Sequence, residues 1–89
     1  MVNDSRVSPH PDAVLRRVGS GAVLVHLGSG QVYELNGTAA RAWELAVEGQ
    51  TATQIIAALE LEFNAASGAI ENDVQELFAF LSSHGLLSQ

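Results

Sequence analysis

The sequence of 89 residues contains no cysteine and no lysine, and aromatic residues make up only 6% of it. The absence of cysteine excludes disulfides, thiolate metal sites and cysteine nucleophiles. No apolar run approaches the roughly 20 residues that are needed to span a bilayer. Residues 1–12 contain no apolar stretch of the kind that secretory signals carry. We therefore expect no membrane partner and a cytoplasmic location.

Positive charge is scarce, and the formal net charge is −6. The basic residues are Arg6, Arg16, Arg17 and Arg41, and every charged residue after Arg41 is acidic. Affinity for nucleic acid rests largely on neutralising phosphates with lysine and arginine. We therefore expect no nucleic-acid partner. An acidic surface suits a cationic partner, or serves only to keep the protein soluble.

The first 12 residues are polar and include Pro9 and Pro11, so we interpret residues 1–12 as a flexible N-terminal tail. Residues 13–89 are then one domain, because a chain of about this size buries enough surface for one modest core. Between residues 14 and 35, apolar residues recur with a period of two, and Gly19-Ser20-Gly21 and Gly28-Ser29-Gly30 interrupt them. This pattern predicts an antiparallel meander, whose most apolar run, residues 22–27, is the central strand.

The period changes at Asn36, a residue type favoured as a helix N-cap. Gly49 is expected to end the first helix, Thr51–Gln54 fits a capping box for the second, and Ser67-Gly68 opens the third. Gly85 ends the third helix, and the pair Leu86-Leu87 is expected to fold back over the core. The order predicts an α+β fold similar to a winged helix-turn-helix, with a three-stranded antiparallel sheet followed by three helices.

Apolar spacing also predicts the core. On the first helix Trp43 falls on the apolar face, and Phe63 and Phe78 take similar positions on the second and third. The apolar stripe of the third helix consists of Ile70, Val74, Leu77, Phe78 and Leu81.

No arrangement typical of catalysis is visible. The three histidines, His10, His26 and His84, share no metal-ligand spacing, and Ser83 is only the sequence neighbour of His84. Gly28-Ser29-Gly30 lies between two predicted strands, so no helix N-terminus is present to hold a phosphate. We expect no catalytic residue, no metal and no cofactor, and therefore no enzyme activity.

Two features point toward a binding function. The strand Gln31–Leu35 is predicted to lie at the sheet edge, and it lacks the lysine or proline that usually blocks an edge. Either this edge is short and covered by a helix, or it is open to an added peptide strand. An open edge also allows a homodimer.

The second feature is the third helix. With Ile70 at zero and about 100° per residue, Phe80, Asp73 and His84 fall at about 280°, 300° and 320°, on one flank of the apolar stripe. Either Phe80 packs under the sheet, or it lines a groove, beside a carboxylate, that accepts a peptide with apolar and basic residues.

The run from Gly30 to Asn36, followed by Ala40–Leu45, resembles the PqqD-like family, which shows a Gly-x-x-Tyr-x-Leu-Asn turn into a helix that carries Ile/Ala-Trp. The resemblance continues through Gly49-Gln50-Thr51, Asp73-Val74 and Phe80-Leu81 and ends at Gly85-Leu86-Leu87. It covers about residues 13–87. The chain differs from the family pattern in its acidic third helix, and it lacks the Pro-Glu-Arg stretch expected before the third strand of quinone-pathway members.

The resemblance implies a recognition element for ribosomally made, post-translationally modified peptides. Such a protein binds the leader segment of a precursor peptide as an added strand and presents it to a modifying enzyme such as a protease, cyclase or radical maturase. The peptide site that it implies here consists of Gln31, Val32, Tyr33, Glu34, Leu35, Asp73, Leu77, Phe80 and His84. Two alternatives stay open: a docking or regulatory subunit without a peptide ligand, and a DNA-binding winged helix, against which the scarcity of positive charge argues.

Overall fold

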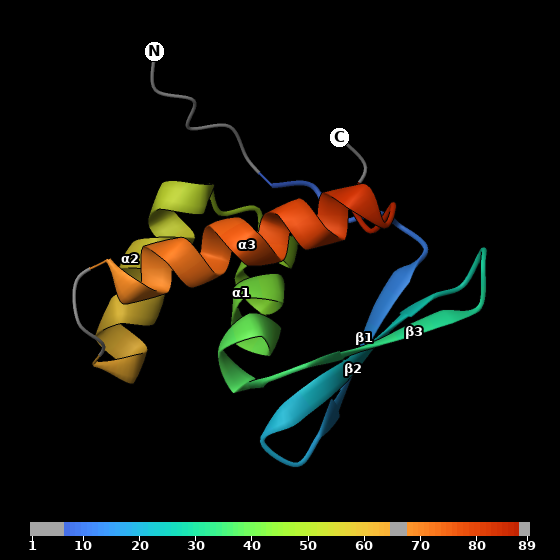
Figure 1. The fold of residues 1–89 in the computed structure, drawn as a ribbon, viewed down its shortest axis with the longest axis horizontal. Helices are drawn as coiled ribbons and strands as arrows, with labels where there is room; N and C mark the ends of the chain where they lie inside the picture. The colour runs from blue at the N-terminus through green and yellow to red at the C-terminus, as the bar shows by residue number, and fades with distance from the viewer. Residues whose placement is uncertain (1–6, 65–67, 88–89) are drawn as a thin grey trace.

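The structure, a computed structural model, describes residues 7–64 and 68–87. Three strands come first: β1 (Ala13–Val18), β2 (Gly21–His26) and β3 (Gln31–Leu35). They form one antiparallel sheet in the order β1-β2-β3, which confirms the predicted meander and its central strand. Three helices follow: α1 (Gly37–Val47), α2 (Ala52–Phe63) and α3 (Ala69–Ser83). Figure 1 shows the helices gathered on one side of the sheet. The α+β fold predicted from the sequence is confirmed.

The helix ends follow the capping residues in the sequence. The Asn36 side chain accepts a hydrogen bond from the Ala39 amide at 2.8 Å. Thr51 and Gln54 form the predicted capping box, in which each side chain bonds the other's backbone amide. Gly85 has a φ of +73°, as expected of a glycine just beyond a helix end. At the start of α3 the cap is Gly68, and Ser67 lies outside the described residues.

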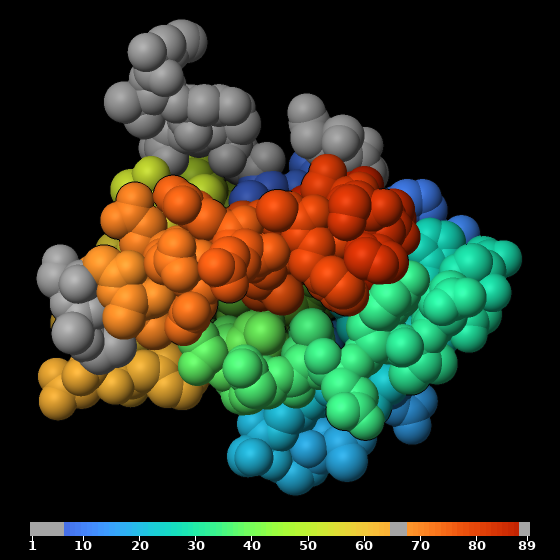
Figure 2. All heavy atoms as spheres, viewed as in Figure 1, coloured from blue at the N-terminus to red at the C-terminus, as the bar shows by residue number. Residues whose placement is uncertain are grey.

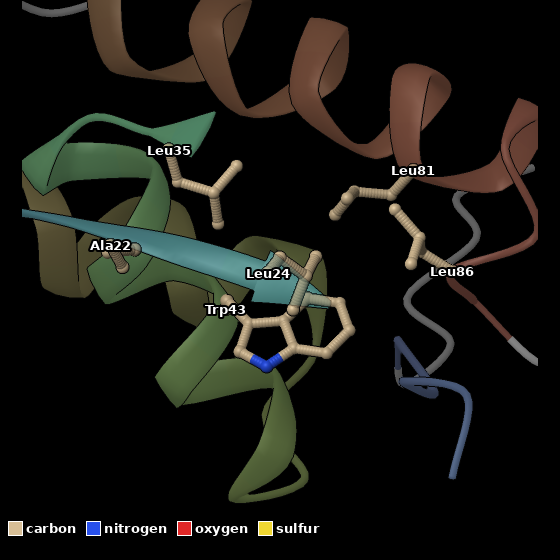
Figure 3. Packing of buried hydrophobic residues seen from close by; sticks show 7 residues of the cluster. Ala22, Leu24, Leu35, Trp43, Leu81 and Leu86 are labelled. Carbon is tan, nitrogen blue, oxygen red and sulfur yellow. The ribbon is translucent and has the colours of Figure 1, made fainter. Parts of the chain in front are cut away.

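The core between the sheet and the helices is built around Trp43, which is only 2% exposed. Leu24 of β2 and Leu81 of α3 are fully buried in the same cluster. Figure 3 shows how the side chains from β2, β3, α1 and α3 point toward one another. Leu86 is fully buried there too, so the chain after α3 does fold back over the core, as predicted.

A second cluster lies among the helices and includes Ile55, Leu59 and Val74. The predicted core position of Phe63 is wrong, because its side chain is 44% exposed. Phe63 is the last residue of α2, and Asn64 then turns the chain with a positive φ of 49°. Phe63 continues the helical stripe of Ile55 and Leu59, but at the very end of α2 it packs against neither core cluster.

Residues 7–12, which the sequence assigns to the tail, contact the domain. The His10 amide donates to the Leu86 carbonyl at 2.9 Å, and Pro9 forms a bridge with Leu87. Val7 packs against the helical cluster. The segment before β1 and the segment after α3 therefore close the same end of the core.

An ion-pair network joins the sheet to the helices. Arg17 of β1 holds Glu44 of α1 through two hydrogen bonds, of 3.0 and 3.1 Å. Arg41 of α1 contacts Glu44 at 3.4 Å and Glu62 of α2 at 2.9 Å. The hydrogen bond from Arg17 lowers the pKa of the Glu44 carboxyl below its ordinary value of 4.5.

Candidate peptide-binding groove

The direction of the backbone groups along β3 follows from the turn between β1 and β2. Gly19 and Ser20 form a two-residue turn in which Gly19 has a φ of +60°, so Val18 and Gly21 are the first hydrogen-bonded pair. Hydrogen-bonded and non-hydrogen-bonded pairs then alternate along the ladder. Two contacts agree with this alternation: the Leu27 amide donates to the Asp12 carbonyl, and the Ala13 amide turns away from β2 toward His10.

The same alternation directs the backbone of Ala22, Leu24 and His26 toward β3. Their partners in the register are Leu35, Tyr33 and Gln31. The N–H and C=O groups of the two remaining residues of β3, Val32 and Glu34, therefore point away from β2. No strand among the described residues pairs with them. The edge of β3 is thus open at two residues.

A groove of about 440 Å³ lies between the end of β3, the start of α1 and α3. In Figure 2, α3 crosses this face above the chain that leads from β3 into α1, and the groove lies between them. Its apolar lining comes from all three elements and consists of Leu35, Ala39, Ala42, Val74, Leu77 and Phe80.

Two carboxylates, those of Asp73 and Glu76, lie beside this apolar lining. Glu34 also borders the groove, but its carboxylate lies with the side chain of Val32 on the other face of the sheet. Glu76 accepts a hydrogen bond of 3.4 Å from Asn72. No arginine of the described chain forms an ion pair with any of the three, whereas Glu44 and Glu62 are paired with Arg17 and Arg41. The groove therefore combines an apolar floor with unneutralised negative charge.

An aromatic cluster closes the groove toward the C-terminal end of α3. The ring of Phe80 lies 5.6 Å from that of Tyr33 and 4.2 Å from that of His84, between centroids. His84 Nδ1 lies 2.8 Å from the Phe80 carbonyl oxygen, which orients the imidazole. Phe80 stays 39% exposed, so it both packs against the sheet and presents a face to the groove.

The residues that the sequence assigns to the peptide site fall into three groups. Glu34, Leu35, Asp73, Leu77 and Phe80 line the groove, and Tyr33 and His84 contact Phe80 at its end. Gln31 and Val32 belong to the edge strand but do not line the groove. The side chain of Val32 is 59% exposed and lies on the other face of the sheet from that of Tyr33.

Sequence reasoning did not identify the contributions to the groove of Asn36, Thr38, Ala39, Ala42, Val74 and Glu76. The signal was present at Ala39 and Ala42. These alanines are spaced by three residues on α1, on a face that borders the core, and their small side chains leave space that larger ones would fill. Apolar spacing predicts which positions face the interior, but it does not predict where small side chains leave a groove.

The described part of the chain contains no helix long and apolar enough to cross a bilayer. Within the same residues, no group of three or more acidic or histidine side chains is arranged to hold a metal ion.

Comparison with known proteins finds a matching family and similar solved structures. The sequence profile of the family described as coenzyme PQQ synthesis protein D (PqqD) matches residues 21–87. A solved structure of TbiB1 in complex with the TbiA(beta) leader peptide is 25% identical in sequence and has a TM-score of 0.80, covering 90% of this chain and 93% of TbiB1. Lasso peptide synthetase B1, complexed with the leader peptide, has the same TM-score at 23% identity, covering 93% of this chain and 98% of that one. No match is found among the curated proteins.

Proposed function

Because the chain belongs to the PqqD family, we propose that it binds the leader segment of a ribosomally made precursor peptide and holds it for a modifying enzyme. The observation that carries this proposal is the open edge of β3 beside the groove. A peptide strand needs free backbone partners, and Val32 and Glu34 offer them. The two similar structures with bound leader peptides support the same function.

The leader is expected to add as a fourth strand next to β3. Backbone hydrogen bonds to Val32 and Glu34 hold it in register, but they do not distinguish one sequence from another. Alternate side chains of the leader then point toward the groove, because strand side chains have a period of two. Selectivity therefore comes from what the groove accepts.

The groove chemistry specifies the leader residues. An apolar side chain fits between Leu77 and the exposed face of Phe80. A lysine or arginine two positions away, on the same face of the leader, fits near Asp73. Nucleic acid is not the proposed ligand, since two of the four arginines, Arg17 and Arg41, are already engaged in ion pairs.

We assign no catalytic step to the domain itself. Ser83 Oγ and His84 Nδ1 lie 3.2 Å apart, but both also contact the Phe80 carbonyl oxygen at the end of α3. The two side chains therefore cap the last turn of α3, and their closeness does not indicate a nucleophile and its base. The chemistry belongs to a partner enzyme such as a protease, cyclase or radical maturase, to which this domain delivers the leader.

The proposal is tested by titrating the domain into fluorescein-labelled leader segments of precursor peptides encoded beside its gene. Fluorescence anisotropy should show saturable binding, and a scrambled leader of the same composition should bind much more weakly. In isotope-labelled protein, amide shifts should concentrate in β3 and α3. If the leader and its scrambled version bind equally, or if the shifts fall on α2 and β1 alone, the proposed function is wrong.

A further inference from the structure

The outer face of the sheet, which points away from the helices, is unusually apolar. In an antiparallel sheet with one solvated face, polar residues normally occupy the outward positions. Here Val18 and Val32 are 60% and 59% exposed, and Val14 is 39% exposed. The outward valines on the three strands are Val14, Val18, Val23, Val25 and Val32. Threonine would satisfy the preference of strands for β-branched residues equally well, so strand formation alone does not account for this face.

Two charged residues flank these valines. In the register of the sheet, Arg16 of β1 is paired with Val23 of β2, which is paired with Glu34 of β3. The three side chains form one row across the outer face, with the arginine on one edge strand and the glutamate on the other. Arg16 and Glu34 are two strand spacings apart, about 10 Å. Neither of them forms an ion pair with another described residue.

This arrangement is complementary to itself. When two such sheets stack face to face about a two-fold axis parallel to β2, β1 of each copy lies opposite β3 of the other. Arg16 then lies opposite the partner subunit's Glu34, Glu34 lies opposite the partner subunit's Arg16, and Val23 meets its own counterpart. The valines form an apolar centre and the ion pairs form a polar rim, which is the usual anatomy of a protein interface.

We propose that the outer face of the sheet binds a second copy of this chain, in an isologous dimer of stacked sheets. Stacked sheets lie about 10 Å apart with strand directions within about 30° of each other, a distance that valine side chains span. The face is only three short strands wide, so the interface is small and the association is weak and reversible. The open edge of β3 stays free, and each copy keeps its groove.

The test is sedimentation velocity at protein concentrations from about 1 µM to about 1 mM, the range over which small interfaces associate. We expect the wild-type protein to shift from monomer to dimer across this range. Val23→Lys should abolish the shift. Leu61→Lys is the matched control, because Leu61 is an 84% exposed leucine on α2, away from the sheet, and its replacement should leave the shift unchanged. Circular dichroism confirms that each variant is folded.

Charge reversal identifies the pairing. Arg16→Glu and Glu34→Arg should each weaken the dimer at least tenfold, because each places like charges opposite one another. The double variant R16E/E34R should restore it. A protein that stays monomeric at about 1 mM, an association indifferent to Val23→Lys, or a double variant no better than the single ones would overturn the proposal. Binding of a different protein to this face by a monomeric chain would also overturn it. Leader peptide is absent from the measurement, so a negative result leaves the proposed function untouched.

Discussion

The ring of Tyr33 meets the ring of Phe80 nearly perpendicularly, with an interplanar angle of 83° and centroids 5.6 Å apart. Tyr33 comes from β3 and Phe80 from α3, so this edge-to-face contact joins the edge strand to the helix across one end of the groove. Aromatic pairs of this geometry contribute roughly 0.5–1.5 kcal/mol beyond the area that they bury. The contact fixes the separation between β3 and α3, and with it the width of the groove.

Phe80 is therefore expected to matter more for leader binding than the carboxylate beside it. Phe80→Ala should weaken binding about tenfold, because it removes the apolar wall and frees the end of α3. Asp73→Asn should weaken binding only about two- to fivefold, as a solvent-exposed ion pair contributes about 0.5–1 kcal/mol. Anisotropy titrations of one labelled leader against both variants measure the ratio. A larger loss from Asp73→Asn would mean that charge, and not the aromatic wall, dominates recognition.

Proline substitutions at neighbouring positions of β3 should have opposite effects. The Tyr33 amide faces Leu24 of β2, so Tyr33→Pro removes a hydrogen bond inside the sheet and should unfold the domain. The Val32 amide points to the open edge, where proline is tolerated in an edge strand. Val32→Pro should therefore leave the melting temperature nearly unchanged while leader binding is lost.

Thermal melts and leader titrations of the two proline variants provide this test. Val32→Ala keeps the backbone amide and is therefore the matched control for Val32→Pro. Val32→Ala should bind the leader within about twofold of wild type. If Val32→Pro binds the leader as tightly as Val32→Ala does, the peptide does not pair with β3.

Much of the fold could be predicted because local signals agreed with one another. Two glycine-containing turns divide a period-two pattern, and Asn36 and Thr51 begin helices through side-chain hydrogen bonds that need no tertiary contact. The prediction for Phe63 was wrong because burial depends on contacts that are not local in sequence. Its spacing fits the α2 stripe, but its burial depends on where the helix ends relative to the rest of the core.

The candidate site was only partly predictable. Asp73 and Phe80 were found because helical periodicity places them on one flank of the apolar stripe of α3, to which Leu77 itself belongs. The groove itself depends on how α3 is placed against β3 and α1, which is set by long-range packing, and Glu76 and Thr38 enter it only through that placement. The alternation of free amides on β3 also required the register of the sheet.

Trp43 should be the main anchor of the core. Its side chain is 2% exposed and packs in the cluster that contains Leu24 and Leu81. Trp43→Ala should lower the free energy of unfolding by about 3–5 kcal/mol, a large part of the roughly 5–15 kcal/mol that stabilises most domains. Chemical denaturation followed by circular dichroism measures the change. A variant that unfolds at the wild-type midpoint but no longer binds leader would mean that Trp43 serves the groove instead.

The ion pair between Arg17 and Glu44 should make stability depend on pH in a defined direction. The hydrogen bond from Arg17 lowers the pKa of Glu44 in the folded state, so the contribution is present above the ordinary value of 4.5 and is lost as pH falls below it through the lowered pKa. At pH 7 and low salt, Glu44→Gln should reduce the melting temperature by a few degrees. The difference from wild type should shrink as the pH falls below 4.5.

Glu48→Gln is the matched control for this measurement, because the described residues give Glu48 no ion pair. Its melting temperature should follow that of wild type at every pH. Added salt should also reduce the effect of Glu44→Gln, since the pair is partly exposed. A difference between Glu44→Gln and wild type that stays constant down to about pH 3 would show that the ion pair does not stabilise the fold.

Filling the groove should block leader binding without removing any residue that contacts the peptide through charge or an aromatic ring. Ala39 lines the groove on the first turn of α1, where its small side chain leaves space that a larger one would fill. Ala39→Leu adds three carbon atoms to that space and should weaken leader binding tenfold or more. Leucine is also a strong helix former, so the helix itself should be unaffected. Ala57→Leu makes the same replacement on the exposed side of α2 and should bind the leader like wild type. Anisotropy titrations of both variants, with melting curves to confirm folding, decide the matter: equal affinity for Ala39→Leu and Ala57→Leu would place the leader outside the groove.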